Sequence, residues 1–183
     1  YVCYPVLKAA SELGVPTAVH ESNAVPGLTT KMLEGSVDTI MVGFEESRAN
    51  YRHPDRVEVT GTPVRVDFLN PDKAAAKREL GIPEGRPLVV SVWGSLGAAH
   101  MNEIMTDFIV RVCAKPFFNL IHSAGKAGYS RMSAALEHEK PDYAKLGMDV
   151  RDYIYDMPRV MAAADLVLCR AGASTLAELT AMG

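Results

Sequence analysis

The segment LVVSVWGSLGA, residues 88–98, decides the fold class. Its apolar, β-branched start (88–93) predicts a buried strand, and the glycines that follow predict a tight turn into a long helix. Outward from this segment, short strand-type runs alternate with helix-type stretches along the chain, and Gly or Pro falls at the joints. This alternation predicts βαβ units around parallel sheets, which is an α/β fold.

The same pattern gives the expected elements. We expect strands at residues 17–20, 39–42, 57–60, 88–93, 117–122, 148–154 and 166–169. We expect helices at residues 5–13, 28–34, 73–80, 100–114, 129–139, 158–163 and 174–182. Asp72 is the expected N-cap of the helix 73–80. The apolar side chains of Ile104, Phe108 and Val112 are expected to form the core-facing stripe of the helix 100–114.

Two domains are expected, residues 1–65 and 66–183. The stretch 61–71 contains two prolines and little periodicity, as linkers do, and a new strand–turn–helix series follows it. Neither half has enough strands for a complete doubly wound sheet. We therefore expect both domains to be incomplete and the chain to be a fragment.

Composition narrows the class of protein. The chain has 183 residues, of which 48% are hydrophobic and 22% charged, so a disordered chain is excluded. A net charge of -3 leaves no basic footprint, and we expect no nucleic-acid partner. No apolar stretch approaches the ~20 residues of a membrane-spanning helix. Three widely spaced cysteines fit neither a disulfide framework nor a zinc site, which indicates a reducing compartment.

Three turns have residues suited to chemistry. In the turn 93–98, glycines and the start of a helix can meet an anion through backbone N–H groups, with Ser95 adding a hydroxyl. The alternative is a tight turn in which Ser95 is only a local cap. In the turn 169–178, Arg170 and a run of small residues lead into a helix, which favours phosphate. The alternative there is a capping box, Thr175-x-x-Glu178.

The third turn is His20-Glu21-Ser22-Asn23, after the strand 17–20. These side chains suit acid–base work or hydroxyl recognition, and a solvated loop is the alternative. The remaining histidines show no spacing typical of metal ligands, so no metal site is expected.

Taken together, these turns resemble the MurG-type N-acetylglucosaminyltransferases of peptidoglycan synthesis. The resemblance rests on five ordered motifs: HESNAVPGLT (20–29), TGTPVR (60–65), GSLGA (94–98) with Asn102, YIYDM (153–157) and RAGASTLAE (170–178). It departs from the family at three positions. Ser22 stands where the family usually has Gln, Thr30 where it has Asn, and Trp93 where it has Gly.

The resemblance implies a GT-B fold, with two Rossmann-like parallel-sheet domains. Residues 1–65 would be the back part of the acceptor domain, and 66–183 the front part of the domain that binds UDP-N-acetylglucosamine (UDP-GlcNAc). The implied reaction is an inverting transfer of N-acetylglucosamine to the C4 hydroxyl of undecaprenyl-diphospho-MurNAc-pentapeptide (lipid I), which gives lipid II. No metal or other cofactor is implied. The implied location is peripheral, at the cytoplasmic face of the bacterial cell membrane.

The resemblance also assigns site residues. His20 and Glu21 are catalytic candidates, but the favoured base is expected to precede Tyr1, so these 183 residues alone are expected to be inactive. Ile154 would meet uracil through its backbone, and Glu178 would take the ribose hydroxyls. Ser95 and the following helix start would hold the diphosphate. The full expected donor set is Asn23, Arg65, Ser95, Ile154, Ala173, Ser174, Thr175, Leu176, Ala177 and Glu178.

Two other functions remain open. The first is another UDP-sugar enzyme of the same architecture, such as a UDP-GlcNAc 2-epimerase, although the segment 20–27 argues against it. The second is a catalytically inactive module that only binds a UDP-sugar.

Overall fold

The computed structural model of the chain describes residues 2–94 and 98–183. The chain divides into two compact units. The smaller consists of Tyr1–Val64 with Leu176–Glu178, and the larger of Arg65–Thr175 with Leu179–Gly183.

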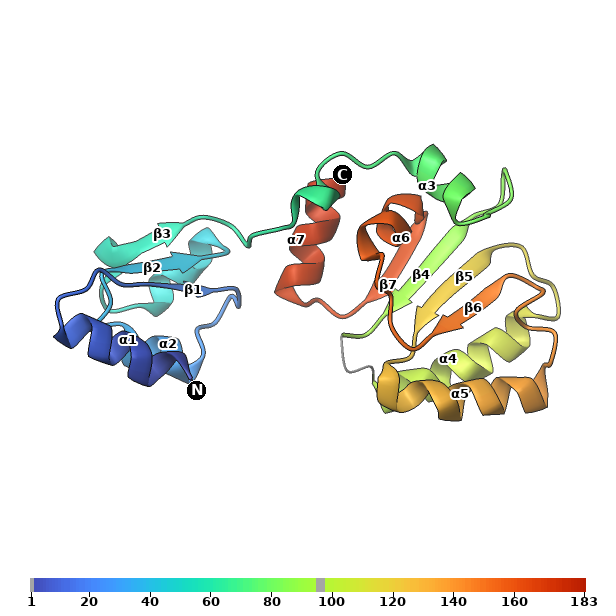
Figure 1. The fold of residues 1–183 in the computed structure, drawn as a ribbon, viewed down its shortest axis with the longest axis horizontal. Coiled ribbons are helices and arrows are strands. Elements are labelled where there is room, and N and C mark those ends of the chain that lie inside the picture. The colour runs from blue at the N-terminus through green and yellow to red at the C-terminus, as the bar shows by residue number, and fades with distance from the viewer. Residues whose placement is uncertain (1, 95–97) are drawn as a thin grey trace. The chain divides into compact units, whose positions relative to one another are not determined.

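The smaller unit is built around a three-stranded parallel sheet (Figure 1). Its strands, in the order β1-β2-β3, are β1 (Ala18–Glu21), β2 (Thr39–Val42) and β3 (Val57–Val59). Its helices are α1 (Cys3–Glu12), α2 (Leu28–Leu33) and the 3-10 helices η1 (Glu45–Asn50) and η2 (Pro54–Arg56). The core is formed by Leu33, Val37, Ile40, Val42, Tyr51 and Val57.

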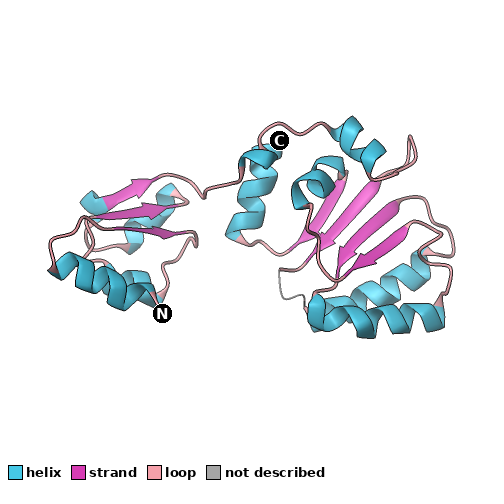
Figure 2. Ribbon diagram, in the orientation of Figure 1, coloured by secondary structure: helices cyan, strands magenta, loops and turns pink. Residues whose placement is uncertain are grey.

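The larger unit holds a four-stranded parallel sheet between two layers of helices (Figures 1 and 2). The strands, in the order β6-β5-β4-β7, are β6 (Met148–Arg151), β5 (Asn119–Ser123), β4 (Leu88–Val92) and β7 (Leu166–Cys169). On one face pack α4 (Ala99–Val112) and α5 (Lys126–Glu139). On the other face pack η3 (Val66–Phe68), α3 (Lys73–Glu79), α6 (Met157–Ala163) and α7 (Ala173–Met182). All five strand residues of β4 are buried, as expected for a strand covered on both faces.

The order of the strands sets where a ligand can bind. From β4 the chain adds β5 and β6 on one side of β4, and it then crosses over to place β7 on the other side. The connection after β4 runs through α4 to one face, whereas the connection after β7 runs into α7 on the opposite face. The point between β4 and β7 is therefore the topological switch point of this sheet.

Most expected elements are present within two or three residues, and β2 and β7 have the expected bounds. The predicted N-cap of α3 is confirmed, since Asp72 Oδ1 accepts a hydrogen bond from the Ala75 N–H at 2.9 Å. The strand expected at 148–154 is shorter and ends at Arg151.

One prediction about a helix is wrong for two of its three residues, and one alternative for a helix start is excluded. In α4, Ile104 is 45% exposed and Phe108 36% exposed, whereas Val112, the third residue of the predicted stripe, is partly buried against the core. The buried residues of the helix are Asn102, Met105 and Ile109, and Cys113 is buried at its C-cap. In α7, Thr175 is not the N-cap. The helix begins at Ala173 after an extended Gly172, which is its N-cap and makes no side-chain capping bond. A capping box at Thr175 is excluded because this residue already lies in the first helical turn.

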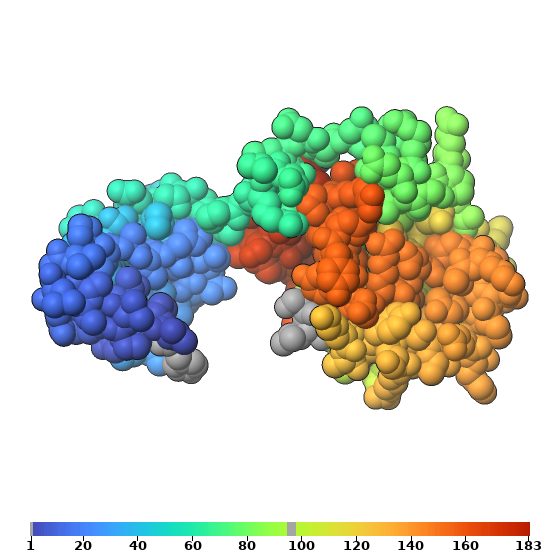
Figure 3. All heavy atoms as spheres, in the orientation of Figure 1, coloured from blue at the N-terminus to red at the C-terminus, as the bar shows by residue number. Residues whose placement is uncertain are grey.

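No helix among the described residues combines the length and the apolar character needed to cross a bilayer. The segment between α3 and β4 projects from the surface of the larger unit (light green in Figure 3). Because it precedes β4, it lies at the amino edge of the sheet, opposite to the edge where ligands of parallel sheets bind.

Candidate active site

The carboxyl ends of β4 and β7 lie side by side in the larger unit, since Val92 pairs with Cys169 at the last ladder position. The next residues of the two strands, Trp93 and Arg170, therefore leave the sheet at the same edge. Ligands of open α/β sheets bind outside the carboxyl ends at the switch point. The candidate donor site is placed here, where two of the sequence-predicted turns come together.

The turn after β7 presents a helix N-terminus to this edge. Gly172 is extended, with φ −75° and ψ 135°, and α7 follows at once. The first N–H groups of an α-helix have no partner within the helix, and they carry the positive end of its dipole. The predicted donor residues Ala173 to Glu178 form the first turns of this helix, which gives them a suitable place for binding an anion.

The turn after β4 begins with Trp93 and Gly94. Gly94 has φ 97°, a conformation that residues with a Cβ rarely adopt, so the chain needs glycine to turn here. Trp93 is half-buried, and its indole Nε1–H donates to Ser91 Oγ at 2.8 Å. Ser95 lies outside the described residues, and its contact with the diphosphate stays a prediction.

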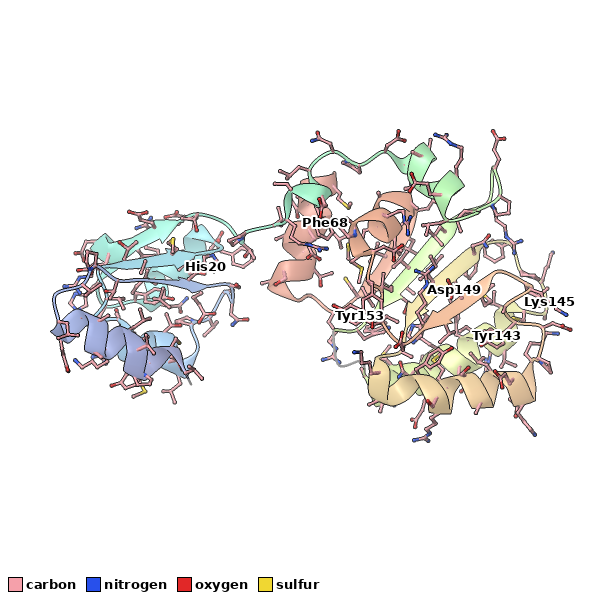
Figure 4. All side chains as sticks on the ribbon, in the orientation of Figure 1. His20, Phe68, Tyr143, Lys145, Asp149 and Tyr153 are labelled. Carbon is pink, nitrogen blue, oxygen red and sulfur yellow. The ribbon has the colours of Figure 1, made fainter. Side chains whose placement is uncertain are left out.

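The end of β6 contributes a third group of residues to the candidate site, beside the turns after β4 and β7. Ile154 is buried, whereas the flanking rings of Tyr153 and Tyr155 are exposed and meet edge to face, with centroids 4.8 Å apart. Figure 4 shows Tyr153 at the carboxyl end of the sheet and Asp149 further back along β6. A hollow of about 350 Å³ at this edge is lined partly by Tyr129, Tyr153 and Tyr155.

Ion pairs hold this group of residues in place. Arg151 binds Asp149 at 2.7 Å and Asp156 at 3.3 Å, and Asp156 also binds Arg159. Burial alone would raise the pKa of Asp156, but the hydrogen bond and charge of Arg159, together with Arg151, hold it below its usual value. Asp156 is therefore ionised at neutral pH and fixes the start of α6 against the end of β6.

Arg65, the first residue of the larger unit, is exposed. Its guanidinium lies over the ring of Phe68 at 5.3 Å from the centroid, a cation–π contact. Phe68, labelled in Figure 4, is fully buried in the core of this unit. The contact holds the guanidinium of Arg65 over the ring, and its N–H groups can still donate to a ligand.

In the smaller unit, Glu21 ends β1 and is buried. One carboxylate oxygen accepts from the N–H of Asn23 at 3.0 Å and from its side-chain amide at 2.8 Å. The other accepts from the Gly27 N–H and the Thr30 hydroxyl, both at 2.9 Å. Burial alone would raise the pKa of Glu21, but these hydrogen bonds together lower it. An ionised carboxylate with four donors holds the loop 22–27 in place and is a weak proton acceptor.

His20, labelled in Figure 4, is half-buried beside Glu21 on β1. Its Nε2 lies 2.9 Å from the Gly61 carbonyl oxygen, and its Nδ1 lies 3.4 Å from Ser22 Oγ. A carbonyl only accepts, so Nε2 donates its N–H to Gly61. The sheet thus brings the motifs 20–29 and 60–65 together. Both ring nitrogens of His20 thus have a partner, the Gly61 carbonyl at Nε2 and the Ser22 hydroxyl at Nδ1.

One buried cluster was missed by the sequence reasoning. Ser91 on β4 and His122 on β5 are paired in register, and both are fully buried. His122 also contacts Asn102 of α4 at 3.1 Å. The available signal was a serine inside the apolar strand β4 and a histidine directly after the apolar pair Leu120 and Ile121 of β5. Elsewhere in the described residues, no group of three His, Cys, Asp or Glu side chains gathers as metal ligands would.

Comparison with known proteins identifies the family. The glycosyltransferase family 28 C-terminal domain matches residues 88–183. The UDP-N-acetylglucosamine--N-acetylmuramyl-(pentapeptide) pyrophosphoryl-undecaprenol N-acetylglucosamine transferase of Acetivibrio thermocellus is 41% identical over 183 residues. That match covers all of this chain and 48% of that protein. The chain thus spans about half the length of the curated relatives that it matches.

The comparison with solved structures points to the same family. The crystal structure of Acinetobacter baumannii MurG is 27% identical and matches with a TM-score of 0.62, over 100% of this chain and 48% of that one. UDP-GlcNAc 2-epimerase from Neisseria meningitidis, at 13% identity and a TM-score of 0.57, covers 90% of this chain and 50% of that one, and shows the fold alone. The predicted GT-B class is confirmed by the MurG match. With its second half matching the C-terminal domain of that family, the chain belongs to glycosyltransferase family 28.

Proposed function

We propose that the protein containing this chain transfers N-acetylglucosamine from UDP-GlcNAc to the C4 hydroxyl of lipid I, producing lipid II. The observation that carries the proposal is the 41% identity, over the whole chain, to a transferase whose name gives both the sugar and the undecaprenol-linked acceptor. In this proposal, residues 1–65 belong to the acceptor domain and residues 66–183 to the donor domain.

The donor would bind at the carboxyl ends of β4 and β7. The N–H groups of Ala173 to Thr175 face the diphosphate, where the helix dipole stabilises negative charge. Ser95 adds a hydroxyl from the turn after β4. Arg65 brings a cation, and the Phe68 ring holds its guanidinium in place.

The nucleoside would lie against the end of β6. The backbone of Ile154 meets the uracil edge, and the hollow of about 350 Å³ beside Tyr153 gives the ring a place. Glu178, in the second turn of α7, accepts hydrogen bonds from the ribose hydroxyls. A carboxylate suits this role because it accepts from two hydroxyls at once.

On the acceptor side, His20 and Asn23 line the proposed site, and Glu21 shapes it. His20 is the better acid–base candidate of the pair, since the carboxylate of Glu21 already accepts four hydrogen bonds. Asn23 keeps its side-chain oxygen for the donor, because its amide nitrogen donates to Glu21. The favoured base remains a residue outside this chain.

The reaction is a single displacement with inversion. The C4 oxygen of the acceptor forms a bond to the anomeric carbon, and the bond to the diphosphate oxygen breaks with its electron pair, so UDP leaves. A base takes the hydroxyl proton. Charge grows on the departing diphosphate, and preorganised N–H groups at the start of α7 stabilise it.

The chemistry of the two substrates also indicates where in the cell the enzyme works. A polyprenyl chain stays in the bilayer, whereas a charged UDP-sugar stays in water on the side where it is made. We therefore propose a peripheral enzyme at the cytoplasmic face of the cell membrane. Nucleic acid is not a proposed partner, since the net charge is -3.

The test is an assay of the full-length protein with UDP-GlcNAc and a lipid I analogue. Lipid II and UDP should form together, and only when the acceptor is present. Conversion of UDP-GlcNAc to its 2-epimer without acceptor would favour the epimerase, and UDP binding without turnover would favour a binding module. Glu178→Ala should weaken UDP binding roughly 2- to 12-fold, the value of one hydrogen bond. Glu137→Ala, on the exposed side of α5, is the matched control.

A further inference from the structure

A continuous chain of hydrogen bonds runs through the buried part of the larger unit. Trp93 Nε1 lies 2.8 Å from Ser91 Oγ, which lies 2.9 Å from His122 Nδ1. His122 Nε2 lies 3.1 Å from Asn102 Oδ1, and Asn102 Nδ2 lies 2.8 Å from the Ala124 carbonyl oxygen. This network of hydrogen bonds therefore joins β4, β5 and α4, three elements that are separate in the sequence.

Every hydrogen bond of this network is donated in the same direction, from Trp93 toward Ala124. The Ala124 carbonyl only accepts, so Asn102 presents its nitrogen there and its oxygen to His122. His122 must then donate from Nε2 and accept at Nδ1 from the Ser91 hydroxyl. Ser91 Oγ in turn accepts the indole proton of Trp93. Burial lowers the pKa of His122 to about 4, which keeps the ring in the neutral form that this pattern requires.

Two residues of this hydrogen-bond network, Trp93 and Asn102, lie on either side of the turn after β4. At one end Trp93 precedes Gly94, where the backbone turns with φ 97°. At the other end Asn102 sits in the first turn of α4, and its N–H donates to the Ala98 carbonyl. The side chain of Asn102 ties that turn to Ala124, at the end of β5. The residues on both sides of the turn are therefore held by one set of hydrogen bonds.

We propose that His122 is a positioning residue for the donor site, which sets the Trp93 indole through Ser91 and the start of α4 through Asn102. This role rests on the proposed function. Buried polar groups destabilise a sheet unless all are satisfied, and a satisfied network fixes one geometry. Here the geometry that is fixed is that of the two residues entering and leaving the proposed diphosphate turn.

Two substitutions of His122 separate its link to Asn102 from its link to Ser91 and Trp93, which we call the Trp93 arm. In His122→Gln the side-chain amide reaches the position of Nε2 and keeps the link to Asn102. In His122→Asn it reaches the position of Nδ1 and keeps the link to Ser91. Ser91→Ala cuts only the Trp93 arm and is the mildest change. His138→Gln, on an exposed histidine of α5, is the matched control.

Two measurements on the full-length protein test the role. The indole ¹H–¹⁵N signal of Trp93, assigned by its absence in Trp93→Phe, should shift in His122→Gln and Ser91→Ala and stay in place in His122→Asn. The KM for UDP-GlcNAc should rise roughly 2- to 12-fold in all three variants, as expected for the loss of one hydrogen bond. The KM for the lipid acceptor and all values for His138→Gln should not change.

An unchanged KM for UDP-GlcNAc in the folded variants of an active enzyme would overturn the positioning role. If both His122 variants fail to fold, Ser91→Ala decides by the same criterion. If the wild-type protein transfers no sugar, the proposed function fails, and the UDP dissociation constants of the same variants then decide the positioning role. Failure of the wild type to bind UDP would overturn both.

Discussion

Glu21 in the smaller unit and His122 in the larger unit are both buried, titratable side chains near the carboxyl end of a strand, and they differ in charge. The hydrogen bonds to Glu21 lower its pKa and keep it ionised. Burial lowers the pKa of His122 to about 4 and keeps it neutral. The partners differ as well. The donors to Glu21 lie two to nine residues away in the sequence, whereas the partners of His122 lie 20 and 31 residues away.

This difference shows what each group is suited to do. An ionised carboxylate has four acceptor sites, so it can gather the unpaired N–H groups of a nearby loop. A neutral imidazole has one donor and one acceptor, so it suits a link between two distant elements. The buried carboxylate of the smaller unit thus shapes a loop locally, and the buried histidine of the larger unit aligns a strand with a helix.

Removing the charge at Glu21 should have the largest effect. In Glu21→Gln, an amide NH₂ replaces an oxygen that accepts from Gly27 and Thr30, and the charge that strengthened the other two bonds is gone. We expect the unit to lose about 4 kcal/mol of unfolding free energy, since hydrogen bonds to charged groups contribute ~1.5–3 kcal/mol each. Hydrogen exchange at the amides of Asn23 and Gly27 measures this loss directly.

The control is Glu46→Gln, which removes an exposed carboxylate from η1 of the same unit. Its amide exchange at Asn23 and Gly27 should match the wild type. Equal protection in the Glu21 and Glu46 variants would show that the loop 22–27 does not depend on the buried carboxylate.

The sequence predicted the frame of both regions. Short, mainly apolar runs gave β2 and β7 with their observed bounds, because such runs have few other ways to be buried. Asp72 was recognisable as an N-cap because its carboxylate is a local acceptor for the third residue of the helix. These features depend on neighbours in the chain.

What could not be predicted depends on contacts between distant segments. Ser91 and His122 become partners only through the register of β4 and β5, which the sequence does not state. In α4, apolar residues are too many for one face, and the buried stripe includes the polar Asn102. A stripe of apolar residues alone therefore pointed to Ile104 and Phe108, which are exposed. The turn at 95–97 and its Ser95 lie outside the described residues.

The next largest effect is expected in the pH dependence of the unfolding free energy, because His122 is neutral in the folded protein. The ordinary pKa is 6.5 and the folded one about 4, so below pH 6.5 the unfolded chain binds more protons. The unfolding free energy therefore falls as the pH falls, by about 2 kcal/mol between pH 7 and pH 5. Urea unfolding, followed by the fluorescence of Trp93, the one tryptophan of the chain, measures it.

His122→Gln provides the comparison, because it removes the titrating ring and leaves the carboxylates in place. Its unfolding free energy should change less between pH 7 and pH 5 than that of the wild type. Parallel pH profiles for the two proteins would mean that His122 binds protons equally in the folded and unfolded chain, and the neutral, buried ring would be refuted.

The smallest effect is expected at Asp72, which performs the task of Glu21 in an exposed place. Its carboxylate accepts one backbone N–H, that of Ala75 at 2.9 Å, and water competes for both groups. Asp72→Ala should cost about 1 kcal/mol, the usual value of an N-cap. Asp72→Asn should recover most of the loss, because asparagine caps helices about as well as aspartate does. The measurement is urea unfolding of both variants at pH 7. A loss at Asp72→Ala as large as that at Glu21→Gln would mean that burial does not set the difference between these carboxylates, and the contrast would then lie in helix capping itself.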